Sequence, residues 1–167
     1  MTNNLTQLKD TEIVAWDDKY ATGIELIDEQ HKQLVALTNE LYSACRAGED
    51  VLQTVFKESM SYMVKYVHFH FDSELKLLNA IKFPDYLVHK KMHDSLVYDI
   101  LAATKDYNEG KKTVPYQFVR TLKDWIFNHI AISDKLFGNY TMELIRKGIM
   151  TPVKLKEIEM SIELSLI

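Results

Sequence analysis

The apolar residues of this 167-residue chain recur in alternating steps of four and three along four long segments. On a helix this spacing puts them on one side, facing a shared interior. The first segment runs from residues 27–28 to Gly48, and its interior stripe is Ile27, His31, Leu34, Thr38, Leu41 and Cys45. The second runs from about Val51 to Ile81, with the stripe Phe56, Met60, Met63, Val67, His70, Glu74, Leu77 and Ile81.

Two further segments continue the pattern. The third follows Phe83-Pro84, since proline disfavours helix at the residue before it, and its stripe is His89, His93, Leu96, Ile100, Ala103 and Tyr107. The fourth opens at Thr113 and Pro115, fades near Gly148, and has the stripe Phe118, Leu122, Trp125, His129, Ile132 and Leu136. Short connections between such helices predict an all-α fold, an antiparallel up-down four-helix bundle.

The chain also extends beyond the bundle pattern at both ends. Residues 1–26 form an N-terminal arm with enough apolar side chains to lie along the bundle, namely Ile13, Val14, Trp16, Tyr20 and Ile24. Residues 149–167 form a C-terminal extension. We therefore divide the chain into a bundle domain with its arm, residues 1–148, and an extension, residues 149–167.

The extension is harder to interpret than the arm. Thr151-Pro152 suits the start of a helix, whereas the alternation from Ile158 to Leu166 also fits a strand. A helix would carry two opposed apolar stripes, one with Leu155 and one with Val153. We expect a helix that packs on the bundle with one stripe and offers the other, through residues 151–167, to a second copy or a protein partner.

Composition and charge exclude several classes of protein. A formal net charge of −4 provides no basic surface for nucleic acid. No apolar run approaches the roughly 18 residues of a membrane span, so no membrane insertion is expected. The first ten residues, MTNNLTQLKD, lack the charged segment followed by an apolar segment that is typical of a secretory signal. We expect a cytoplasmic protein, and a single cysteine, Cys45, rules out an internal disulfide.

Side chains that bind metals lie on these interior stripes or beside them. There are seven, including five of the six histidines: His31, His70, Glu74, His89, His93, His129 and Asp134. A single histidine on an apolar stripe is most often a hydrogen-bonded core residue. Five on four helices are different, because imidazoles and carboxylates are costly to bury unpaired. The pattern predicts that the core binds metal.

The spacing of these residues indicates how they meet. Residues four apart lie one turn above another, so His70 with Glu74, and His89 with His93, each present two ligands to one site. Asp134 follows His129 by five residues, about 140° round an ideal helix. Either Asp134 reaches in from the flank or the helix is locally widened. His68 points about 160° away from His70 and is expected at the surface.

The ligand set favours iron over zinc. Structural zinc takes four ligands, often cysteines, and seven ligands overfill it. Five imidazoles and two carboxylates suit two six-coordinate iron ions. A ferritin-like site needs two Glu-x-x-His pairs, and the sequence contains none. The expected cofactor is therefore a pair of non-heme iron ions in a site unlike that of ferritin.

Four motifs give the chain a family resemblance. They are the lead-in Trp16, Tyr20, Gly23-Ile24, Ile27-Asp28 and Gln30-His31, then His70-Phe71-x-x-Glu74, then Phe83-Pro84 with His89-x3-His93, and last Trp125-x3-His129-Ile130-x3-Asp134. Together they resemble the hemerythrins, specifically the bacteriohemerythrins, over about residues 14–146. Two features depart from the family. Leu75 stands where many relatives have a second glutamate, and the tail after Gly148 is longer.

The resemblance implies a role for each ligand and a function. His89, His93 and His129 would hold one iron, and His31 and His70 the other. Glu74 and Asp134 would bridge the two irons with an oxygen atom, and the second iron would bind O2, held as hydroperoxide. The O2 pocket would consist of Leu34, Phe71, Trp125, Ile126 and Ile130. None of these offers an acid, so we expect a reversible O2 carrier, store or sensor and no enzyme.

Two other functions fit the same residues. One is a di-iron redox enzyme that handles peroxide or NO. The other is a signalling input module that acts through a partner protein. A turnover assay separates the first of these from reversible O2 binding.

Overall fold

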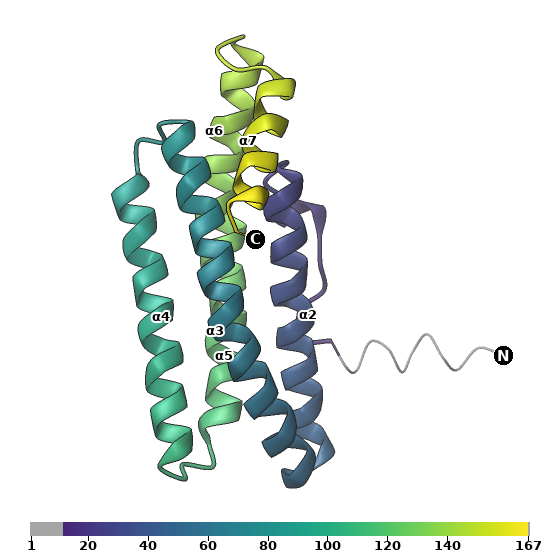
Figure 1. Ribbon diagram of the computed structural model, residues 1–167. Coiled ribbons are helices and arrows are strands. Elements are labelled where there is room, and N and C mark those ends of the chain that lie inside the picture. Colours follow the sequence, from purple (N-terminus) through teal and green to yellow (C-terminus); the bar gives the residue numbers. More distant parts are fainter. Residues whose placement is uncertain (1–11, 167) are drawn as a thin grey trace, which may run out of the picture.

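The computed structural model describes residues 12–166, and all regular secondary structure within that range is helical. Four long rods stand side by side as an up-down bundle (Figure 1). Three of them are α2 (Glu25–Ala47), α3 (Glu49–Ala80) and α4 (Tyr86–Asn108). The fourth is a composite of α5 (Val114–Trp125), the π-helix η2 (Ile126–Asp134) and α6 (Lys135–Arg146). The predicted four-helix bundle is confirmed.

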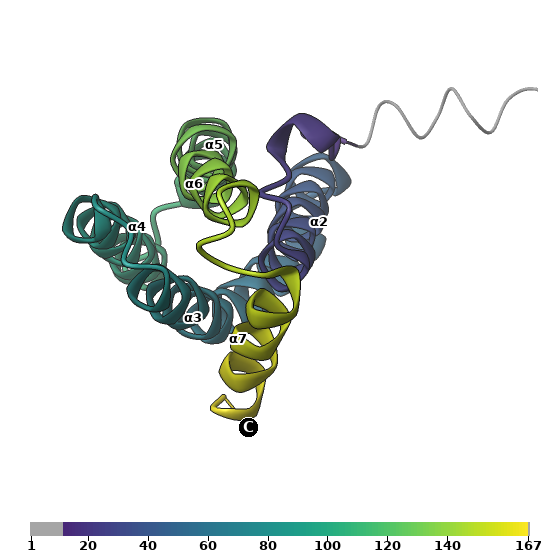
Figure 2. The ribbon, with the colours of Figure 1, turned by 90° about the horizontal axis from the view of Figure 1, so that it is seen from above.

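Short connections make successive helices antiparallel. Gly48 alone separates α2 from α3, and its φ of 109° lies in the left-handed region that favours glycine. Residues 81–85 connect α3 to α4, and residues 109–113 connect α4 to α5. In the end-on view the rods surround a shared interior, with α2 beside α3 and α5, and α4 beside α3 and α5 (Figure 2).

The interior stripes agree best with the prediction in α3. All eight residues predicted to face inward on this segment are buried, from Phe56 to Ile81. On α2 the stripe is buried as far as Leu41, while Cys45 is only partly buried. On α4 it is buried as far as Ile100, while Ala103 and Tyr107 are partly buried. The interior positions of α2 and α4 are therefore less completely buried toward the end of the bundle where these two helices terminate.

The fourth rod departs from the predicted stripe. Ile132 and Leu136 were predicted to face inward, but they are 55% and 58% exposed. The reason is η2, whose wider turns rotate the following residues relative to a regular α-helix. Phe137 and Thr141 take the interior positions instead, each 0% exposed. The prediction for Ile132 and Leu136 was wrong because it carried one helical period through a segment that changes period.

The N-terminal arm lies against the bundle, as expected. The side chain of Asn39 on α2 accepts hydrogen bonds from the backbone N–H groups of Ile13 and Val14, both at 3.0 Å. Its amide nitrogen donates to the carbonyl of Val14 at 2.7 Å. A short 3-10 helix, η1 (Asp18–Tyr20), then leads to α2 with Tyr20 buried. Residues 1–11 of the predicted arm lie outside the described part of the chain.

The C-terminal extension forms a helix, α7 (Pro152–Leu164), and the strand alternative is wrong. It lies beside α2 and α3 (Figure 2), where Leu155 and Ile162 join a buried cluster with Ile24, Ile27 and Leu77. Its other stripe faces outward, with Val153, Met160 and Leu164 exposed. None of the helices described here is long and apolar enough to cross a membrane.

Candidate metal centre

The seven predicted ligands come together in the middle of the bundle. α2 supplies one, α3 and α4 supply two each, and η2 supplies two: His31; His70 and Glu74; His89 and His93; His129 and Asp134. Each is at most 3% exposed. Their nitrogen and oxygen atoms form two groups, each within 4.8 Å, and Glu74 belongs to both.

Glu74 lies between the two groups of histidines. Its Oε1 is 3.3 Å from Nε2 of His31 and 3.5 Å from Nε2 of His70. Its Oε2 is 3.1 Å from Nε2 of His89 and 2.9 Å from Nε2 of His93. Each carboxylate oxygen therefore faces a different pair of imidazoles, which is the arrangement of a carboxylate that can bridge two cations.

Asp134 repeats this arrangement from the opposite rod. Its Oδ2 is 3.1 Å from Nε2 of His31, while its Oδ1 is 3.1 Å from Nε2 of His129 and 3.4 Å from Nε2 of His89. Asp134 ends η2, and the π-helical turns bring it to the same side as His129 despite the spacing of five residues. The locally widened helix is thus the alternative that the structure supports.

Several buried nitrogen and oxygen atoms at this site have no hydrogen-bond partner. Among residues 12–166, no donor is aligned for a hydrogen bond to Nε2 of His70 or to either carboxylate oxygen of Asp134, although imidazole nitrogens lie 3.1–3.4 Å from those oxygens. Nε2 of His93 and Nε2 of His129 face each other at 3.1 Å. Buried polar groups are normally paired, and a cation would satisfy these converging nitrogen and oxygen donors together. The residues present therefore fit a metal site.

Burial and mutual contact shift the pKa values of the same groups. Burial lowers the pKa of His31, but the carboxylates of Asp134 and Glu74 outweigh it and raise that pKa to about 9. Burial raises the pKa of Asp134, as does the charge of Glu74, yet His129 and His31 bring it down to about 2. A proton on His31 thus partly neutralises two buried carboxylates. Burial lowers the pKa of His70 to about 3, which leaves its ring neutral.

A chain of hydrogen bonds orients His70. Its Nδ1 lies 2.8 Å from Oε1 of Gln30, the amide nitrogen of Gln30 donates to Oγ of Ser73 at 3.2 Å, and Ser73 donates to the carbonyl of Phe69. Because the amide nitrogen of Gln30 donates to Ser73, the atom that faces His70 is Oε1, which can only accept a hydrogen bond. The proton of the neutral imidazole is therefore on Nδ1. Nε2 of His70, on the side that faces Glu74, keeps its lone pair available for a metal ion, as a metal-binding histidine requires.

Tyr66 supports this arrangement from one turn away. Its hydroxyl donates to the backbone carbonyl of Gln30 at 2.9 Å, and its ring stacks on that of His70 with 5.1 Å between centroids. Sequence reasoning assigned no role to Gln30, Ser73 or Tyr66. The one available signal was the polar Gln30 directly before His31, within the interior face of α2.

The five residues predicted to line the O2 pocket also lie together. Leu34, Ile126 and Ile130 are each 0% exposed, and all five belong to or pack against one core cluster. The ring of Phe71 stacks on His93 with 3.7 Å between centroids and 6° between planes. Trp125 stacks on His129 at 3.9 Å and 22°. These two rings therefore cover histidines that the resemblance assigns to the first iron, and the O2 pocket itself stays a prediction. His68 is exposed, as expected.

Fold and site together define a helical-bundle protein with a buried, histidine-rich metal site. Comparison with known proteins agrees. The family "Hemerythrin HHE cation binding domain" matches residues 22–140. The chain belongs to the hemerythrin family, and the resemblance seen in its motifs is confirmed.

Individual relatives match over most of their length. A bacteriohemerythrin of Methylococcus capsulatus is 28% identical over 120 residues, which cover 72% of this chain and 89% of the relative. A hemerythrin-like protein of Naegleria gruberi is 35% identical over 119 residues, covering 71% and 86%. A bacteriohemerythrin of Pseudomonas aeruginosa is 29% identical over 121 residues, covering 72% and 76%.

Proposed function

We propose that this chain holds two non-heme iron ions and binds O2 reversibly through them. The observation that carries the proposal is the position of Glu74, whose two oxygens face different pairs of histidines at 2.9–3.5 Å. His31 and His70 would hold one ion. The other would be held by His89, His93 and His129, with Glu74 and Asp134 as bridges.

The side chains around the site favour binding over turnover. When bound, iron supplies the reversible electron donation on which O2 binding depends. The chain itself supplies a dry enclosure, because Leu34, Ile126 and Ile130 are fully buried. Trp125 adds a buried indole N–H without a partner among the described residues, but an indole is a donor and not an acid. No pocket residue delivers a proton to a ligand, so nothing there promotes cleavage of the O–O bond.

The names of the relatives agree with this assignment, since several are bacteriohemerythrins. The test is a cycle of oxygenation. The reduced protein is exposed to O2 and then flushed with argon while its absorption spectrum is recorded. We expect the spectrum to change and return over repeated cycles. Complete oxidation at first exposure, or steady turnover of peroxide or NO, would favour a redox enzyme instead.

A pair of variants on η2 sharpens this test. Ile130→Ala opens the buried pocket to water, whereas Ile132→Ala alters a side chain that is 55% exposed. We expect the first variant to oxidise irreversibly faster than the parent after oxygenation, and the second to behave as the parent. Equal rates in both variants would mean that Ile130 is ordinary core packing.

A further inference from the structure

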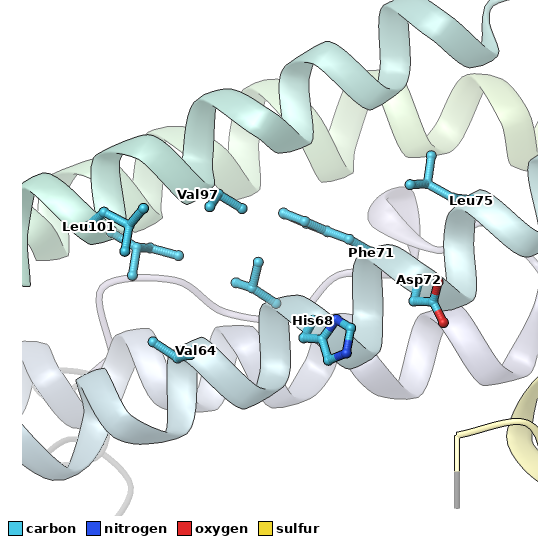
Figure 3. Close-up of a pocket in the computed structure, with 9 residues that line it drawn as sticks. Val64, His68, Phe71, Asp72, Leu75, Val97 and Leu101 are labelled. Atoms are coloured by element: carbon cyan, nitrogen blue, oxygen red, sulfur yellow. The ribbon is translucent and has the colours of Figure 1, made fainter.

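An apolar groove opens on the surface between α3 and α4. Its volume is about 340 Å³. Val64 on α3 and Leu101 on α4 form its mouth, at 55% and 61% exposed, and Val97 on α4, which is 37% exposed, lies between Leu101 and Phe71 (Figure 3). His68 and Asp72 are the polar residues of its lining, and both lie on α3. Most of the wall is hydrocarbon, so the groove offers little to a polar ligand.

The inner wall of this groove contacts the candidate metal centre. Phe71 extends from α3 into the groove (Figure 3) and is 7% exposed. The same ring stacks on the imidazole of His93 at a centroid distance of 3.7 Å. A molecule in the groove that touches Phe71 is thus separated from His93 by the thickness of one aromatic ring.

We propose that this groove is the route by which a small apolar gas reaches the candidate metal centre, with Phe71 as the side chain that opens and closes it. The inference rests on the proposed function, for which the gas is O2. O2 loses no hydrogen bonds when it leaves water, whereas a hydrated anion loses several. Apolar walls therefore admit O2 and retard hydrated anions. The ring of Phe71 also lies 5.6 Å from that of His70, so side-chain rotation at Phe71 opens a path past His93 toward the ion that His31 and His70 would hold.

Filling the groove at a residue that is not itself a candidate ligand tests this route. Val97→Trp places a large side chain between mouth and inner wall, and Val51→Trp is the matched control, because Val51 is a similarly exposed valine of α3 outside the groove. A blocked route slows the arrival and the departure of O2 equally and leaves the affinity unchanged. A damaged binding site alters the affinity. Association and dissociation rates of the iron-loaded protein, measured by flash photolysis and stopped flow, separate the two cases.

We expect Val97→Trp to lower both O2 rate constants about tenfold, the effect of about 1.4 kcal/mol added to the barrier, with Val51→Trp unchanged. Val64→Phe, on the opposite wall of the groove, provides a second variant if the first does not fold. Unchanged rates in a folded groove variant would overturn the proposal, as would a change in affinity alone.

A second measurement does not depend on O2 binding. Xenon, an apolar atom, is introduced under pressure into crystals of the protein as purified and located by its anomalous scattering. We expect xenon against Phe71 in the parent and in Val51→Trp, and none there in Val97→Trp. Absence of xenon from the parent groove would overturn the route. A parent that holds xenon at Phe71 but binds no O2 would overturn the proposed function, and with it the assignment of O2 as the gas.

Discussion

The carboxylate of Glu159, on the C-terminal helix, accepts a hydrogen bond at 3.2 Å from the backbone N–H of Leu26, in the first turn of α2. Helix α2 has no side-chain cap of its own, since Ile24 occupies the capping position. Glu159 is 4% exposed, and its other oxygen pairs with Lys156 at 2.9 Å. The extension therefore provides the missing cap for the helix that carries His31.

This contact predicts a specific loss of stability. Glu159→Ala removes the cap and should lower the free energy of unfolding by about 1 kcal/mol, typical of a lost helix cap. Glu163→Ala is the matched control on the exposed face of the same helix. Urea denaturation of both variants provides the measurement, and equal stability would mean that the Glu159–Leu26 contact contributes nothing.

Truncation after Gly148 tests the proposed boundary between bundle and extension. The seven candidate ligands all precede this residue, so the iron spectrum should persist. The melting temperature should fall, because removal of Leu155 and Ile162 uncovers the cluster around Ile24 and Leu77. Loss of iron would show that residues 149–167 belong to the bundle domain.

The outward stripe of α7 needs its own variant. Val153, Met160 and Leu164 are 69%, 59% and 72% exposed, and replacing all three by serine leaves the inward stripe intact. If α7 binds a second copy, light scattering will show a smaller species for this variant than for the parent. The same mass for both would show that this stripe does not bind a second copy.

Gln30 is predicted to set the affinity for metal without contacting it. Gln30→Leu removes the acceptor at Nδ1 of His70 and should weaken iron retention about 10- to 100-fold, as for other groups that orient metal ligands. Gln30→Glu keeps an acceptor and should retain iron. The control is Gln33→Leu, an exposed glutamine on the same helix. Iron loss to a chelator is the measurement, and equal loss in the Gln30→Leu and Gln33→Leu variants would contradict the role.

The metal-free protein should have a stability that depends on pH on both sides of neutrality. The pKa of His31 rises from 6.5 to about 9 on folding, so its contribution is complete below pH 6.5 and is lost as the pH rises through 9. The pKa of Asp134 falls from 3.8 to about 2, so its contribution is present above pH 3.8 and is lost as the pH falls through 2.

His70 adds to the loss on the acid side. Its folded pKa of about 3 keeps it neutral where the unfolded chain takes up a proton, so stability falls as the pH drops below 6.5. Urea denaturation of chelator-treated protein should therefore give a maximum near neutral pH. His31→Gln should remove the decline between pH 6.5 and 9 that His31 causes. A decline of the same size in that variant would show that other groups cause it.

The sequence predicted most where the helical period is regular. The stripe of α3 holds from Phe56 to Ile81 because no irregularity interrupts that helix, so both His70 and Glu74 were placed correctly on its inner face. In the fourth rod the five-residue step from His129 to Asp134 was the one sign of a wider helix. Ile132 and Leu136 were misplaced because nothing in their own residue types reports the change of period.

Other features depend on packing between distant parts of the chain. Gln30 and Ser73 are 43 residues apart, and their hydrogen bond requires a particular rotation of α2 against α3. The groove beside Phe71 likewise depends on the separation of α3 from α4. Periodicity determines which face of a helix is buried, but not how closely two helices approach.

The central claim is that the two groups of histidines, joined by Glu74 and Asp134, hold a pair of iron ions. The most direct test is metal analysis of protein purified from iron-replete cells, together with its near-ultraviolet absorption. We predict about two iron atoms per chain and the absorption of an oxo-bridged diferric site, as expected for seven nitrogen and oxygen ligands. One zinc ion per chain and no iron would contradict the account.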